Sequence, residues 1–143
     1  MVFDLLIKNG FIVDGTGNPG FYGDIAVKDD KIEEIKSELD VEADKVIDAS
    51  GLVVAPGFID PHVHEELASI NKRNQEVFLR QGVTTIINGN CGHSVTPYSS
   101  KNVLEYTYKN GLISEKAKNS LPEWEDYEGY VEVIKDKGIN INM

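Results

Sequence analysis

Short apolar segments separated by polar turns fill the first 56 residues of the chain. Residues 4–13 (DLLIKNGFIV) predict two short strands around Asn9-Gly10, a pair that is typical of tight hairpin turns. Similar apolar segments predict further strands at 24–27, 31–35, 45–48 and 52–55. Six short strands with polar turns between them predict a small β domain over residues 1–56.

The pattern changes at Pro56-Gly57, after which apolar strands alternate with helical segments. Residues 58–62 form the first predicted strand, and residues 65–81 show a helical pattern that Gly82 should end. Residues 83–88 (VTTIIN) are rich in β-branched side chains and predict the next strand. This alternation of strand and helix predicts a parallel sheet in a second domain, residues 57–143.

The last third of the chain predicts one further helix and one further strand. Residues 97–121 are polar with weak periodicity, and we interpret them as an insertion. The predicted helix opens at Leu121-Pro122-Glu123, ends at Lys137-Gly138 and presents one apolar stripe: Trp124, Tyr127, Val131 and Ile134. Residues 139–143 begin another apolar strand, so the sequence has the character of a fragment of a longer protein.

Composition and charge exclude several classes of partner. The 143 residues include 14 basic and 24 acidic side chains, which give a net charge of −10. Such a chain is a poor ligand for nucleic acid or for an anionic membrane. The first 15 residues have no basic start followed by a long apolar segment, so they predict neither a secretory signal nor a membrane span. We therefore expect a cytoplasmic protein.

The segment GFIDPHVH, residues 57–64, contains the first candidate chemistry. A strand turns every second side chain to the same face, so Asp60, His62 and His64 should point the same way. Two neighbouring imidazoles can bind one cation, and a carboxylate beneath them can orient a ligand ring. The alternative is that both histidines are ordinary surface or core residues.

The only cysteine, Cys91, lies in a glycine-flanked loop (GNCG) directly after the strand predicted at 83–88. A single cysteine forms no internal disulfide, so its thiol is buried, reactive or a metal ligand. The carboxyl end of a strand is where α/β barrels keep their chemistry, which favours the ligand. His93, two residues later, is either a surrogate ligand or a loop or supporting residue. Glu65 and Glu66 fit a solvated helix start.

Three stretches together resemble a known family: DLLIKNGFIVDGTG, GLVVAPGFIDPHVH and QGVTTIINGNCGHS. They resemble the amidohydrolase superfamily, and within it the N-acyl-D-amino-acid deacylases, or D-aminoacylases. The PGFIDPHVH motif is shared with dihydroorotases, hydantoinases and imidazolonepropionases, whereas GVTT followed by GNCG is similar to the deacylase branch. Members of that branch are roughly three times longer than a single domain of ~150 residues.

The resemblance implies a fold, a metal and a reaction. The fold is an α/β arrangement in which a small amino-terminal β domain, part of a composite β-sandwich, precedes the first β/α units of a metal-dependent TIM-like (β/α)8 barrel. His62, His64 and Cys91 would be metal ligands, with Asp60 supporting them, and the cofactor would be Zn²⁺. A thiolate with imidazoles suits this ion. The reaction would hydrolyse the amide of a small N-acyl-D-amino acid to a carboxylate and a D-amino acid.

In the resembled enzymes two further histidines and a catalytic aspartate lie on later strands. The aspartate is therefore expected beyond Met143, and the isolated chain is expected to lack deacylase activity. His93 departs from the resembled enzymes, which usually have an apolar residue there. Glu65 and Glu66 follow the histidines where those enzymes tend to have acids, which is the alternative to a solvated helix start. The apolar strands at 83–87 and 139–141 would leave an open barrel edge, through which we expect self-association.

Two alternatives to a deacylase remain open at the level of the sequence. The first is a cyclic-amide hydrolase of the dihydroorotase or hydantoinase type. Those enzymes usually bridge two metals with a carboxylated lysine, whereas GNCG supplies a thiolate in that neighbourhood. The second is a noncatalytic metal-binding or assembly fragment.

Overall fold

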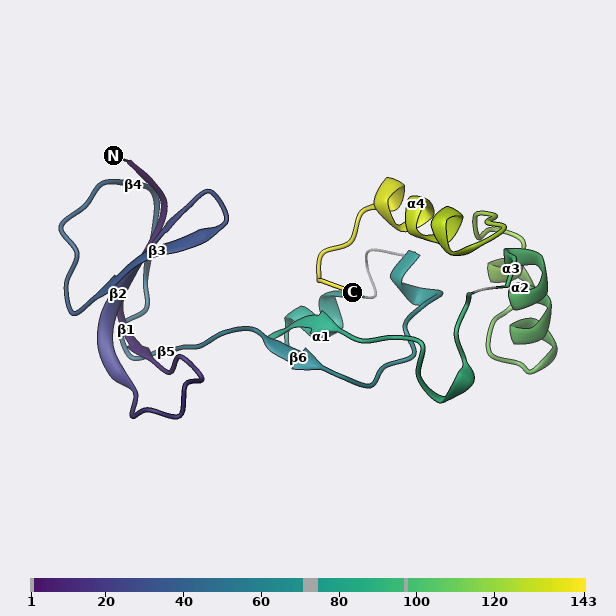
Figure 1. Cartoon of the computed structure of the whole chain (residues 1–143), viewed down its shortest axis with the longest axis horizontal. Helices are drawn as coiled ribbons and strands as arrows, with labels where there is room; N and C mark the ends of the chain where they lie inside the picture. The colour runs from purple at the N-terminus through teal and green to yellow at the C-terminus, as the bar shows by residue number, and fades with distance from the viewer. Residues whose placement is uncertain (1, 71–74, 97) are drawn as a thin grey trace. The chain divides into compact units, whose positions relative to one another are not determined.

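A computed structural model of the chain describes residues 2–70, 75–96 and 98–143. The chain divides into two compact units, Met1–Pro56 and Gly57–Met143. The first is made of strands, and the second combines two strands with short helices (Figure 1). No helix in the described ranges is long and apolar enough to cross a membrane.

The first unit is a single twisted sheet of five strands. They are β1 (Phe3–Ile12), β2 (Phe21–Lys28), β3 (Lys31–Lys36), β4 (Ala43–Asp48) and β5 (Val53–Val54). The strand order is β3-β2-β1-β4, and β5 pairs with the far end of β1. The pairs β1–β2 and β2–β3 are antiparallel, whereas β4 and β5 both run parallel to β1. The predicted strands at 24–27, 31–35, 45–48 and 52–55 are therefore confirmed.

The hairpin predicted at Asn9-Gly10 is wrong. Residues 3–12 form one ten-residue strand, in which the register with β2 shifts between Ile7 and Gly10. Asn9 adopts the left-handed conformation, with φ of 61°, and its backbone N–H donates to the Asp24 carboxylate over 2.8 Å. Because an acceptor on the neighbouring strand satisfies this amide, the Asn-Gly pair makes a β-bulge and the strand continues.

A small cluster of buried apolar side chains forms the core of this unit. The buried cluster contains Phe3, Leu6, Ala26 and Leu39. The Asp24 carboxylate is buried beside it and also accepts the backbone N–H of Leu39 over 2.9 Å. The Asp24 carboxylate therefore connects the segment after β3 to the bulge in β1, because it accepts a backbone N–H from each.

The second unit begins with two parallel strands, β6 (Phe58–Asp60) and β7 (Val83–Ile86). The predicted strand 58–62 is thus two residues too long. On the other side of β7, the backbone N–H of Ile86 donates to the Asn142 carbonyl over 2.9 Å. Thr85 and Asn142 form a parallel bridge, so the strand predicted from 139 is limited to one bridge. The parallel sheet is confirmed.

The continuous helix predicted at 65–81 is wrong in its described part. That part contains a 3₁₀ turn, η1 (Ala68–Ile70), and one helical turn, α1 (Glu76–Leu79), while residues 71–74 lie outside the described ranges. The buried Gln75 amide donates to the Ser69 carbonyl over 3.1 Å and accepts the Asn140 backbone N–H over 2.6 Å. The buried Gln75 side chain thus satisfies two backbone groups that have no partner within a helix.

Three helices follow: α2 (Ser100–Lys109), α3 (Glu115–Lys118) and α4 (Tyr127–Lys137). The segment interpreted as an insertion therefore contains helices. Helix α4 begins six residues later than the predicted opening at Leu121, because the Asp126 side chain caps it by accepting the Gly129 backbone N–H over 2.9 Å. Gly138 ends the helix as predicted.

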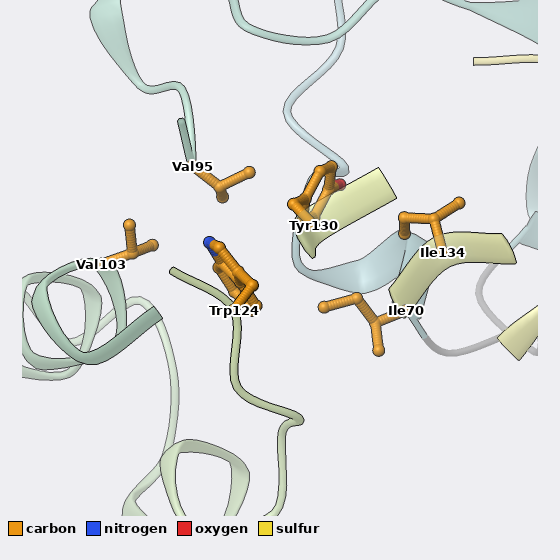
Figure 2. Close-up of a cluster of buried hydrophobic side chains, with 6 residues drawn as sticks. All are labelled: Ile70, Val95, Val103, Trp124, Tyr130 and Ile134. Atoms are coloured by element: carbon orange, nitrogen blue, oxygen red, sulfur yellow. The ribbon is translucent and has the colours of Figure 1, made fainter. Parts of the chain in front are cut away.

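The core of the second unit forms around Trp124 (Figure 2). The Trp124 and Tyr130 rings meet edge to face, with 5.4 Å between their centres. The predicted stripe is correct for Trp124 and Ile134, but Tyr130 is buried where Tyr127 was expected, and Tyr127 is 62% exposed. The buried cluster comprises Ile70, Val95, Val103, Trp124, Tyr130 and Ile134.

Candidate metal centre

The candidate site is built from the two loops that follow β6 and β7. Backbone pairing continues beyond the strands, since Ile87 donates to the Asp60 carbonyl over 2.9 Å and Val63 donates to the Ile87 carbonyl over 3.2 Å. The Asn90 side-chain amide bridges both loops by donating to the carbonyls of Ile87 and Val63 over 2.8 and 3.3 Å. The two loops are therefore held in a fixed relation to each other.

Two further side chains fasten the loops together. The Glu66 carboxylate accepts the Gly89 backbone N–H over 2.6 Å, and the Asn88 side chain accepts the Glu65 backbone N–H over 3.2 Å. Glu66 is only 7% exposed, so its interpretation as part of a solvated helix start is wrong. Its backbone carbonyl accepts the Tyr130 hydroxyl over 2.7 Å, which connects the loops to α4.

Both motif histidines lie in the first loop. Because β6 ends at Asp60, neither His62 nor His64 belongs to the strand on which we expected them. Their rings are nevertheless adjacent, with 5.4 Å between centres and an angle of 79° between planes. The Asp60 carboxylate accepts the His62 backbone N–H over 3.1 Å, and this hydrogen bond orients the His62 backbone.

Cys91 meets these histidines from the second loop. It lies in a 3₁₀ turn, η3 (Asn90–Gly92), and adopts a left-handed backbone with φ of 55°. Its sulfur is 3.3 Å from the His62 Nε2 atom, and the thiol is exposed. This distance agrees with the expectation that the thiol and the histidines face the same place.

One donor atom from each of His62, His64 and Cys91 lies within 4.8 Å of the other two. Donors on a tetrahedral zinc ion, bound at about 2.0–2.3 Å, lie about 3.3–3.8 Å apart, so the observed spacing needs little adjustment. Two imidazoles with a thiolate are donors that zinc prefers. The residues present therefore fit this ion.

The third histidine, His93, lies beside this set of three donors. Its ring meets the His64 ring edge-on, with 5.6 Å between centres and an angle of 85°. Asn88 and Asn90, which hold the two loops together, were not predicted, because they give no signal in a pattern of apolar and polar positions. Both are recognisable only once the two loops are known to be neighbours.

Burial raises the pKa of two side chains near the loops. Partial burial, and then the nearby Glu66 carboxylate, raise the pKa of Glu65 above its ordinary value. Burial, followed by the charge of Glu66, raises the pKa of the Tyr130 hydroxyl above its ordinary value. Tyr130 therefore stays protonated at neutral pH and remains a donor to the Glu66 carbonyl.

Comparisons with known proteins agree with this architecture. The chain is 43% identical over 100 residues to a D-aminoacylase from Alcaligenes xylosoxydans, an alignment that covers 70% of this chain and 21% of that protein. It is 47% identical over 85 residues to an adenine deaminase from Listeria monocytogenes, covering 59% of this chain and 14% of that enzyme.

A solved structure extends the similarity to almost the whole chain. The crystal structure of N-acyl-D-glutamate deacylase from Bordetella bronchiseptica, complexed with zinc and a phosphonate inhibitor, matches with a TM-score of 0.72. The match is 29% identical and covers 96% of this chain and 27% of that one. The predicted fold class, a small β domain followed by the first β/α units of a TIM-like barrel, is thereby confirmed.

The chain spans about a fifth of the length of the D-aminoacylase and about a quarter of the deacylase of known structure. The sequence profile described as the amidohydrolase family matches residues 45–126, which is more than half of the chain. This range includes both loops of the candidate site. The chain therefore belongs to the amidohydrolase family.

Proposed function

We propose that this chain forms part of a zinc-dependent amidohydrolase that hydrolyses the amide bond of N-acyl-D-amino acids. In this proposal His62, His64 and Cys91 are metal ligands and Asp60 supports them. The observation that carries it is the convergence of three donor atoms within 4.8 Å, from two loops at the carboxyl ends of adjacent parallel strands. The same edge is where barrel enzymes of this architecture keep their reactive groups.

The chain's own residues would hold and orient the ion. His62 and His64 bind as neutral imidazoles and Cys91 binds as a thiolate, so ligation removes protons from these side chains. Asp60 fixes the backbone of His62, and Glu66 fixes that of Gly89 at the start of the Cys91 turn. When bound, zinc would polarise the scissile carbonyl and lower the pKa of water to about 7.

The choice of substrate is supported by the relatives. The similar proteins include a D-aminoacylase and an N-acyl-D-glutamate deacylase, and the latter structure was determined with zinc. The thiol beside the histidines favours an N-acyl-D-amino-acid deacylase over a cyclic-amide hydrolase. Enzymes of the dihydroorotase or hydantoinase type usually have a carboxylated lysine, and not a thiolate, in this neighbourhood. The match to an adenine deaminase makes adenine the necessary competing substrate in any assay.

A chimaeric enzyme tests this proposal. The segment of the Alcaligenes D-aminoacylase that aligns with this chain would be replaced by the present sequence, and the purified zinc-loaded protein assayed with N-acetyl-D-methionine, its L-enantiomer and adenine. We expect release of D-methionine from the first substrate alone. Cys91→Ala should lower kcat/KM by more than ~100-fold, beyond the cost of losing a group that only supports a ligand.

Ser94→Ala provides the matched control, because Ser94 lies in the same loop and its hydroxyl bonds to Thr96 over 3.2 Å. That variant should retain the activity of the chimaera. The proposal is wrong if Cys91→Ala and Ser94→Ala are equally active. It is also wrong if the chimaera deaminates adenine and leaves the N-acyl-D-amino acid intact.

A further inference from the structure

We propose that His93 is a fourth metal ligand, so that this chain binds one divalent transition-metal ion through a complete set of one thiolate and three imidazoles. This inference rests on the proposed function for the position of the ion. It goes further in assigning a role to a residue outside the set formed by His62, His64 and Cys91.

The first support is the distribution of donors along the chain. The 143 residues contain three histidines and one cysteine, and all four lie in the two loops after β6 and β7. The nearest-neighbour contacts form a continuous row: Cys91 to His62, His62 to His64 and His64 to His93. A histidine that only makes the surface polar would not need to lie beside the other three donor residues.

The second support is the geometry of the rings. Imidazoles that share one tetrahedral zinc ion, with Zn–N bonds of 2.0–2.1 Å, have ring centres about 5 Å apart. The observed separations are 5.4 Å for His62 and His64 and 5.6 Å for His64 and His93. Both pairs also meet nearly at right angles, at 79° and 85°, so neither pair is stacked.

The third support is the backbone of the second loop. Cys91 and Gly92 have positive φ values of 55° and 74°, and the His93 N–H donates back to the Asn90 carbonyl over 2.9 Å. This tight turn places the His93 ring beside the His64 ring. The His93 side chain is exposed, so rotation about its side-chain bonds can carry a ring nitrogen to an ion held by the other three donors.

A fourth protein ligand changes what the site does. Structural zinc sites are closed by four protein ligands, whereas a catalytic site leaves one position for water or substrate. His93 would occupy that position in this chain, so one thiolate and three imidazoles would surround the ion. The chain would then bind its ion tightly without a donor from another segment or molecule.

Cobalt(II) titration of the 143-residue chain tests the inference, because a thiolate–cobalt bond absorbs in the near ultraviolet and tetrahedral cobalt absorbs strongly in the visible. We expect one ion per chain with both features. His93→Cys should roughly double the thiolate absorption per bound ion by adding a second sulfur. His93→Ala should weaken cobalt affinity by more than about 10-fold, the lower limit for losing a supporting group. It should also lower the visible absorption, and added imidazole should restore it.

Ser94→Ala is the control in the same loop and should behave as the parent chain, while circular dichroism verifies that each variant is folded. Unchanged thiolate absorption in His93→Cys, together with unchanged affinity in His93→Ala, would overturn the inference and leave the three-ligand site intact. A parent chain whose cobalt complex lacks thiolate absorption would instead overturn the proposed function. The two failures are therefore distinguishable.

Discussion

Cys91 has a strained, left-handed backbone, and its thiol lies beside the His62 ring. Its φ of 55° and ψ of 18° lie in the left-handed region, where a residue with a Cβ costs about 1–2 kcal/mol. Glycine adopts this conformation readily, and Gly89 and Gly92 on either side do so. Within the turn 89–92, Cys91 is the residue that has both a side chain and a left-handed backbone.

Two substitutions at Cys91 separate the backbone from the thiol. Both Cys91→Gly and Cys91→Ala remove the sulfur, but only glycine also removes the left-handed strain. In the absence of metal we expect Cys91→Gly to be more stable than Cys91→Ala by about 1 kcal/mol, despite glycine's greater conformational entropy in the unfolded chain. Urea denaturation checks this, and equal midpoints would show that the turn is unstrained.

The three proposed ligands were predictable from the sequence because their motifs are local. HxH at two-residue spacing and a lone cysteine between glycines, each after an apolar segment, indicate one edge of a parallel sheet. The supporting residues were not predictable in the same way. Glu66 follows the histidines as a solvated acid would, and its burial depends on the Gly89 amide and on Tyr130, 64 positions later.

At the scale of elements, the close approach of β6 and β7 depends on Gly57. A Cβ added there would lie 2.1 and 2.3 Å from the Oγ1 and Cγ2 atoms of Thr84, and 2.7 Å from its Cβ atom. These distances are well inside van der Waals contact. The absence of a side chain at Gly57 therefore allows the two strands to pair and brings their loops together.

Gly57→Ala should destabilise the chain by about 1–2 kcal/mol, because the added methyl group would meet the partly buried Thr84 side chain. Thr84→Ala removes the two closest atoms and leaves only its Cβ atom, at 2.7 Å, so it should recover part of this loss in the double variant. A double-mutant cycle in urea measures the coupling. Additive effects of the two substitutions would mean that the strands separate without using this contact.

Elements with local signals were predictable, and elements decided by distant partners were not. The strands β2 to β5 follow from their apolar segments and turns. Asn9-Gly10 makes a bulge because Asp24, 15 residues away, satisfies the Asn9 amide. Helix α4 starts late because Asp126 caps it, and its buried face uses Tyr130 because Trp124 lies before the helix and packs against that ring.

At the scale of the whole molecule, every proposed metal donor belongs to the unit Gly57–Met143. The same unit exposes apolar side chains on its first strand, since Phe58 and Ile59 are 62% and 63% exposed. Patches of this kind often mark a surface that another segment or chain covers. Self-association through an open barrel edge remains a prediction of the sequence.

X-ray absorption spectroscopy of the zinc-loaded chain tests the metal centre most directly, because it reports the atoms bound to the ion. We predict one sulfur at about 2.3 Å and nitrogen neighbours at about 2.0–2.1 Å. The sulfur should vanish in Cys91→Ala, and the imidazole scattering should weaken when His62 and His64 are both replaced by alanine. A parent spectrum with only oxygen or nitrogen neighbours, unchanged in these variants, would contradict a zinc site at these loops.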